Sequence, residues 1–220
     1  MLVLRMPPKE QAFRPRIADL ARLQPGEVVL DVGCGTGTLA LEALQRVGAT
    51  GRVSGIDPSG QKIAHARHKA ERAGLSLDFQ VVVIEQLVFP DQTFDVVLST
   101  FMMHHLPDDL KCQGLAEIVH VLKPGGHLLV FDMKGPAGPW KSSIRDQPAL
   151  MKEAGFSQIE TGKTRFPGLG FVLGKKLAGD GRRPCRFRCN EVKGKSHTRP
   201  SCIVDTPLAT LKGINGLVSE

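Results

Sequence analysis

Long hydrophobic runs are missing from this 220-residue sequence. No apolar stretch reaches the roughly 18 residues that a membrane-spanning helix needs, so the sequence predicts no membrane span. The opening stretch, MLVLRMPPKEQ, has an apolar run too short for a typical secretory signal. Glu10 and Asp19 interrupt the basic pattern that a mitochondrial transit peptide would show. We therefore expect a cytoplasmic protein, with mitochondrial import as the alternative.

Cysteine is scarce, odd in number and scattered, which excludes a disulfide framework and favours a reducing compartment. Three of the five cysteines lie near the C-terminus, where a histidine accompanies them. A C-x3-C pair followed by H-x4-C, with no strand or helix pattern around it, matches zinc-site spacing poorly. We therefore predict no metal site. The residues concerned are Cys34, Cys112, Cys185, Cys189, His197 and Cys202.

Basic residues outnumber acidic ones in the last part of the chain. The net charge is +7, yet residues 1–174 hold 19 basic and 18 acidic residues, whereas 175–220 hold ten and four. Beyond Leu177 there is no helical or strand period, and glycine, proline and charge dominate, which predicts an irregular basic tail. We expect an N-terminal cap segment at 1–24, one domain at 25–177, and the tail at 178–220. The tail's arginines have one aromatic neighbour, Phe187, so we expect no nucleic-acid partner.

Strand and helix patterns alternate along the domain. Alternation of this kind predicts an α/β fold with a Rossmann-like, doubly wound and mostly parallel sheet. A final hairpin predicts an antiparallel C-terminal edge strand, and KPGG at 123–126 is expected to separate a helix from the next strand. The expected strands are 27–32, 51–57, 77–83, 93–100, 127–133, 158–166 and 169–176, and the expected helices are 37–47, 59–74, 109–122 and 148–156.

Three glycines follow the first expected strand, in VVLDVGCGTGTLAL at 28–41. Ligands of such sheets bind at the carboxyl ends of the strands, and Asp57, which ends the second strand, could accept hydrogen bonds from a ribose diol. The G-x-G-x-G spacing of Gly33, Gly35 and Gly37 differs from the G-x-G-x-x-G of dinucleotide sites. Asp31 beside the turn would repel a pyrophosphate and would suit a cationic ligand. A tight turn with a helix-capping acid, binding nothing, stays the alternative.

Several motifs together resemble those of class I S-adenosylmethionine-dependent methyltransferases, especially the branch that acts in ubiquinone and menaquinone biosynthesis. The resemblance spans about 25–174. It implies a Rossmann-like fold, S-adenosylmethionine as cofactor, and methyl transfer to a small-molecule substrate through oxygen, nitrogen or carbon. It leaves the acceptor and the oligomeric state open. The motifs are DVGCGTG, GIDPS, EQLVFPDQTFDVVLSTFMMHHL, LKPGGHLLVFD and EAGF.

The resemblance also implies roles for individual residues. The glycine turn would pass beneath the methionine part of the cofactor, near whose ammonium Asp31 would lie, and Asp57 would bind the ribose. The adenine would be flanked by Pro58 and contacted at Ile84 and Glu85, and Ser99 would contribute near the amino-acid end.

His104 and His105 would face the acceptor, where either could be a base if the acceptor is a hydroxyl or an acidic carbon. The alternative for both histidines is a hydrogen bond to the backbone at a helix entry. Three further histidines, His65, His68 and His120, are expected on helix surfaces.

Among the departures from the family pattern, one bears on cofactor binding. The family usually has a Gly-Asp pair where this chain has Val82 and Val83, and a valine cannot accept a hydrogen bond from the adenine amino group. Loss of one such contact weakens binding by about 1–3 kcal/mol. This departure keeps a second hypothesis open, in which the chain is a catalytically silent methyltransferase-like module whose basic tail binds RNA or an anionic surface.

Overall fold

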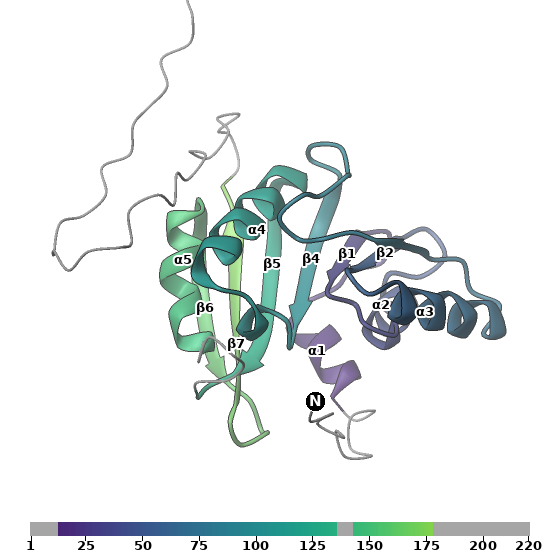
Figure 1. Ribbon diagram of the computed structural model, residues 1–220, viewed down its shortest axis with the longest axis horizontal. Helices are drawn as coiled ribbons and strands as arrows, with labels where there is room; N and C mark the ends of the chain where they lie inside the picture. The colour runs from purple at the N-terminus through teal and green to yellow at the C-terminus, as the bar shows by residue number, and fades with distance from the viewer. Residues whose placement is uncertain (1–12, 136–142, 178–220) are drawn as a thin grey trace, which may run out of the picture.

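A single twisted sheet runs through the part of the chain that the computed structural model describes, residues 13–135 and 143–177 (Figure 1). Its seven strands lie in the order β3-β2-β1-β4-β5-β7-β6. The first five strands pair in parallel, and β7 is antiparallel to both of its neighbours, β5 and β6. The predicted fold class is confirmed. The terminal hairpin forms one edge of the sheet: β6 is the edge strand, and β7 lies between β6 and β5. The strands are β1 (Val28–Val32), β2 (Arg52–Asp57), β3 (Asp78–Val81), β4 (Phe94–Thr100), β5 (Leu122–Met133), β6 (Phe156–Lys163) and β7 (Leu169–Lys176).

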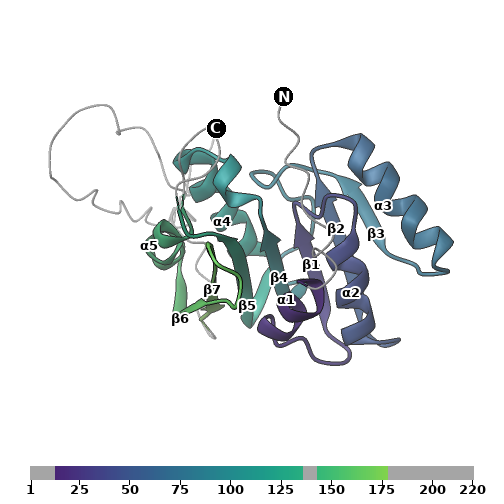
Figure 2. The ribbon, with the colours of Figure 1, turned by 90° about the horizontal axis from the view of Figure 1, so that it is seen from below.

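Helices cover both faces of the sheet (Figure 2). Side chains of α1, α2 and α3 share one hydrophobic cluster with one face, and those of α4 and α5 share a second cluster with the other. Right-handed crossovers between parallel strands require helices of this kind. Among the described residues, no helix is both long and apolar enough to cross a membrane. The helices are α1 (Arg14–Leu20), α2 (Thr38–Val47), α3 (Gly60–Arg72), α4 (Asp108–Val121) and α5 (Gln147–Glu153).

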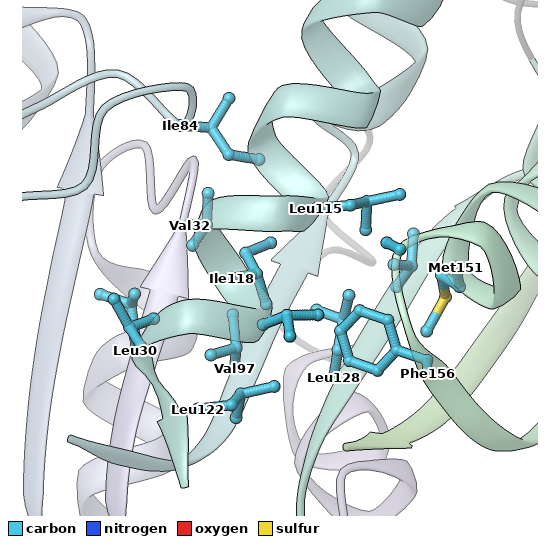
Figure 3. Close-up of a cluster of buried hydrophobic side chains, with 14 of the residues drawn as sticks. Leu30, Val32, Ile84, Val97, Leu115, Ile118, Leu122, Leu128, Met151 and Phe156 are labelled. Atoms are coloured by element: carbon cyan, nitrogen blue, oxygen red, sulfur yellow. The ribbon is translucent and has the colours of Figure 1, made fainter. Parts of the chain in front are cut away.

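The cluster under α4 packs this helix on the central strands (Figure 3). Leu115 and Ile118 of α4 are fully buried among strand side chains such as Val97 and Leu128. Full burial of a side chain of this size stabilises the fold by about 1.5–3 kcal/mol. The helix expected at 109–122 therefore packs on the sheet through an apolar face, and it ends at Val121.

Two local expectations were wrong. KPGG does not separate helix from strand, because α4 ends at Val121 and β5 already begins at Leu122. Gly126 lies where β5 comes close to β4, since a Cβ at this position would come within 2.8 Å of the Asp95 carbonyl oxygen. The helix expected at 59–74 ends at Arg72, and Ala73 is its exposed C-cap. The predicted tail at 178–220 lies outside the described residues.

Candidate functional site

Polar side chains gather where the central parallel strands end. Asp31, Asp57 and Ser99 stand at or near the carboxyl ends of β1, β2 and β4, and each is almost completely buried. Parallel pairing brings these ends to one edge, because Val32 is in register with both Ile56 and Ser99. This edge is where sheets of this topology bind their ligands. The structure therefore brings the principal residues expected from the sequence to one place.

The glycine turn after β1 is fixed to β2 by its backbone. The amides of Gly33 and Cys34 both donate to the Ile56 carbonyl at 2.8 Å. Gly33, Gly35 and Gly37 all have positive φ, at 73°, 56° and 72°, a region that costs residues with a side chain about 1–2 kcal/mol. The turn thus needs glycine for its backbone conformation before any ligand is considered.

The three glycines differ in what surrounds them. A Cβ at Gly33 would lie 2.6 Å from Cγ of Met102, and one at Gly37 would lie 2.7 Å from Cζ of Phe79. A Cβ at Gly35 would meet nothing within 4 Å. The chain's own packing therefore explains the first and third glycines, and the second faces open space in which a ligand can approach the backbone.

Asp57 ties the turn to α3. Its Oδ2 accepts a hydrogen bond from the Gly35 amide at 3.1 Å, and its Oδ1 accepts one from the Ser59 amide at 2.9 Å. The ammonium of Lys62 lies 3.5 Å from Oδ2. Each carboxylate oxygen has a second acceptor position, so Asp57 can hold the turn and still accept a hydrogen bond from a ligand hydroxyl.

Asp31 is fully buried, and neither of its carboxylate oxygens has a hydrogen-bond partner within the described ranges. The pKa of Asp31 is raised to about 7, chiefly by burial and in smaller part by the nearby Asp57, whereas Arg14 of α1 and the backbone amide of Ala40 oppose the rise. The hydroxyl of Ser99 is also buried without a partner there. A buried polar group without a partner costs about 1–3 kcal/mol. A buried carboxyl group that has no partner and whose pKa lies near neutrality fits a cofactor that carries a cationic group, because a nearby cation favours the charged form of the carboxyl group.

The residues expected around an adenine are more dispersed. Pro58 is exposed and Glu85 half-buried, whereas the side chain of Ile84 is buried against Gly114, whose Cβ position lies 2.6 Å from it. The Ile84 side chain is therefore taken up by the core, and only its backbone is left for a ligand. Val83 is 38% exposed, and the neighbouring Val81 is also exposed. The segment after β3 thus offers an apolar surface in place of an acid.

His104 and His105 have different environments. His104 is buried, and its Nδ1 lies 2.6 Å from Oδ1 of Asp132 at the end of β5. Its main-chain amide donates to Oδ2 of the same carboxylate at 3.1 Å. His105 is exposed, and its ring packs on that of His104 with 3.9 Å between the centroids. Partial burial, followed by the charges of His104 and Lys62, lowers the pKa of His105.

Asp132 was missed by the sequence reasoning. The available signal was its position, since it comes near the end of an apolar strand just as Asp31 and Asp57 do. The expectation for the remaining histidines agrees with the structure: His65 and His68 lie on exposed positions of α3, and Nε2 of His120 pairs with Asp91 at 2.6 Å.

No group of three or more side chains that could hold a metal ion is found in the described part of the chain. Cys34 is buried, and burial raises the pKa of its thiol, which fits a small residue that fills space within the turn. The four residues considered for zinc, from Cys185 to Cys202, lie outside the described residues.

Comparison with known proteins finds similarity to methyltransferases. A family model for a methyltransferase domain matches residues 29–126. The chain is 36% identical over 130 residues to the ubiquinone/menaquinone biosynthesis C-methyltransferase UbiE of Hydrogenovibrio crunogenus, covering 58% of this chain and 50% of that one. It is 37% identical over 134 residues to the demethylmenaquinone methyltransferase of Listeria welshimeri, covering 59% and 55%. The chain thus spans about half the length of the curated relatives it matches.

Solved structures share the fold. A SAM-dependent methyltransferase from Aquifex aeolicus superposes with a TM-score of 0.65 at 25% identity, covering 78% of this chain and 94% of that one. The [4+2]-cyclase SpnF superposes with a TM-score of 0.68 at 22% identity, over 77% and 81%, which shows the fold alone.

Proposed function

We propose that this chain, which carries a class I S-adenosylmethionine-dependent methyltransferase domain, binds S-adenosylmethionine and transfers its methyl group to a small organic acceptor. The observation that carries the proposal is the unpaired Asp31 carboxylate beside the turn at Gly35. A chain that bound nothing there would be more stable with an apolar residue in place of Asp31. A cationic ligand converts that cost into binding energy.

The residues of the chain would divide the work of binding and alignment. Asp31 would attract the ammonium of the cofactor, Asp57 would accept from its ribose hydroxyls, and Gly35 would let the backbone approach it. The cofactor, when bound, supplies a methyl group on a sulfonium, which is already a good leaving group. The protein's contribution is therefore to hold the acceptor in line and exclude water.

We further propose that the acceptor loses a proton during the reaction, and that His105 accepts it. His105 is exposed and its lowered pKa keeps the imidazole neutral near neutral pH. His104, held through its ring and its backbone amide by Asp132, would position the ring that packs on it. The names of the curated relatives indicate quinone precursors as the first acceptors to test.

The first experiment is calorimetry of the full chain with S-adenosylhomocysteine, followed by transfer of a labelled methyl group to a short-chain demethylmenaquinol. We expect one-site binding that Asp31→Asn abolishes and that Arg145→Gln, at an exposed position in the short turn before α5, leaves unchanged. Absence of binding at millimolar ligand would refute the cofactor proposal. Binding of S-adenosylhomocysteine without methyl transfer would refute only the choice of acceptor.

The silent-module hypothesis rests on Val83 and on the basic tail. Val83→Asp in the full chain tests the first of these, because a 38% exposed position accepts a carboxylate with little effect on folding. If adenine binding is intact but weakened, this variant should bind S-adenosylhomocysteine about tenfold to a hundredfold more tightly. A module that no longer uses the cofactor would show no binding in either form, and its binding of a generic RNA would fall steeply with salt.

A further inference from the structure

A groove with one basic wall, formed by α3, lies beside the glycine turn. Its volume is about 490 Å³, within the range of small-molecule sites. Four of its lining residues come from α3 at spacings of three, four and seven residues, which places them on one face of the helix. Thr36 of the glycine turn forms the opposite wall. The full lining is Thr36, His65, His68, Lys69, Arg72 and Ala73.

Lys69 is the central cation of this groove, and only neutral oxygens hold it. Its ammonium donates to the Thr36 carbonyl at 2.8 Å, the Thr36 hydroxyl at 3.2 Å and the Thr38 hydroxyl at 2.7 Å. Partial burial, together with the positive charge of Arg14, lowers the pKa of Lys69. The groove therefore already contains more positive charge than its own side chains neutralise.

Counter-charge is lacking throughout the groove. None of its lining residues is acidic, and within residues 13–135 and 143–177 neither Lys69 nor Arg72 forms an ion pair. Elsewhere in the same ranges basic residues do pair, as Arg46 does with Asp19 at 2.6 Å and Lys123 with Asp95 at 2.8 Å. An anion would complete this cluster in the way that carboxylates complete the others.

We propose that the groove between Thr36 and α3 binds a phosphate group. Arg72 supplies a guanidinium donor from the same helix face as Lys69, whose N–H groups are bonded to Thr36 and Thr38 and which contributes its positive charge. The hydroxyl of Thr36 adds a neutral donor from the opposite wall. Asp31, Asp57 and Ser99 do not line the groove, so this site is distinct from the proposed cofactor site and does not depend on methyl transfer.

The test is a titration of the full chain with inorganic phosphate, followed by NMR of the His65 and His68 rings and the Thr36 amide. Sodium chloride at matched ionic strength is the reference. We expect saturable shifts at these positions, lost in Lys69→Gln/Arg72→Gln and kept in the control Arg145→Gln/Lys152→Gln, which removes the same charge from exposed positions around α5. Because Lys69 also anchors the turn, His68→Gln/Arg72→Gln provides a second variant that leaves that anchor in place, and we expect it to weaken binding at least fivefold.

Two further arms identify the source of the phosphate and the independence of the site. Flotation with vesicles containing phosphatidylglycerol, compared between the wild type and the two groove variants, distinguishes a lipid headgroup from a soluble phosphate compound. S-adenosylhomocysteine should leave the phosphate shifts in place, whether or not it binds. Shifts that chloride reproduces, that persist in both groove variants, or that S-adenosylhomocysteine displaces would overturn the proposal.

Discussion

His104 and Asp132 are joined twice, once through the ring and once through the backbone. Nδ1 of His104 lies 2.6 Å from Oδ1 of Asp132, and Oδ2 accepts the His104 amide at 3.1 Å. Oδ1 also accepts the Met133 amide at 2.8 Å. One buried carboxylate thus fixes the segment after β4 to the end of β5, on which the placement of His105 depends.

Asp132→Asn should therefore destabilise the fold. The amide group offers one acceptor atom to three N–H donors and turns its own NH₂ toward one of them, so we expect a loss of about 2–4 kcal/mol in the free energy of unfolding. Urea denaturation measures it, with Asp109→Asn, at an exposed position of α4, as the control that should stay within about 0.5 kcal/mol. Equal stability of the two variants would show that the carboxylate is not required to fix this segment.

The lowered pKa of His105 predicts a specific response to Lys62. Because the positive charge of Lys62 is one of the causes that disfavour the imidazolium form, Lys62→Gln should raise the pKa of His105 toward its ordinary value near 6.5. As the pH falls, His105 would then become protonated at a higher pH than in the wild type. The acid limb of any pH–rate profile should move to higher pH as well. Titration of the His105 ring by NMR measures the shift directly. An unchanged or lower pKa would contradict the assignment.

The fold could be predicted further than the site. Apolar period and turn residues located the strands and helices, because these signals are local in the sequence. Met102 and Gly33 show what local signals cannot supply: they are distant in sequence, and only the folded chain reveals that the side chain of one requires the absence of a side chain at the other. Asp132 was missed for the same reason, because its partner His104 is 28 residues away in the sequence, in the segment after β4. KPGG misled because proline and glycine also occur where strands approach closely.

Asp31 should make the stability of the ligand-free protein fall as pH rises. Its pKa in the folded state is about 7, above its ordinary value of 3.8, so the folded state holds this proton more tightly than the unfolded state between these values. The resulting destabilisation is small below pH 4 and reaches its full size above pH 7. Between pH 5 and pH 8, we expect it to lower the free energy of unfolding by about 2–3 kcal/mol. Denaturation at both pH values, compared with Asp31→Asn, measures this contribution. A wild type and variant with the same pH dependence would exclude it.

Gly33→Ala and Gly35→Ala should separate packing from binding. Both place a side chain at positive φ, which costs about 1–2 kcal/mol, but only the first also collides with Met102. We expect Gly33→Ala to be the less stable protein, with partial rescue by Met102→Ala. Gly35→Ala should keep most of its stability and lose S-adenosylhomocysteine binding, because its methyl group enters the open space. Calorimetry and thermal denaturation of both variants give the comparison, and undiminished binding by Gly35→Ala would place the ligand elsewhere.

Asp57→Ala should weaken S-adenosylhomocysteine binding more than Glu85→Ala does. Asp57 is buried, accepts from the Gly35 and Ser59 amides and stands at the strand end expected to meet the ribose, whereas Glu85 is half-buried in the segment after β3. Loss of a charged acceptor for a ligand hydroxyl weakens binding by about 1.5–3 kcal/mol, or roughly tenfold to a hundredfold. Because Asp57→Ala also releases the turn, Asp57→Asn provides the matched control, since its side-chain oxygen can still accept one of the two amides. Calorimetry on the three variants decides the order. Equal losses at both positions would mean that Glu85 has taken over the adenine contact that Val83 cannot make.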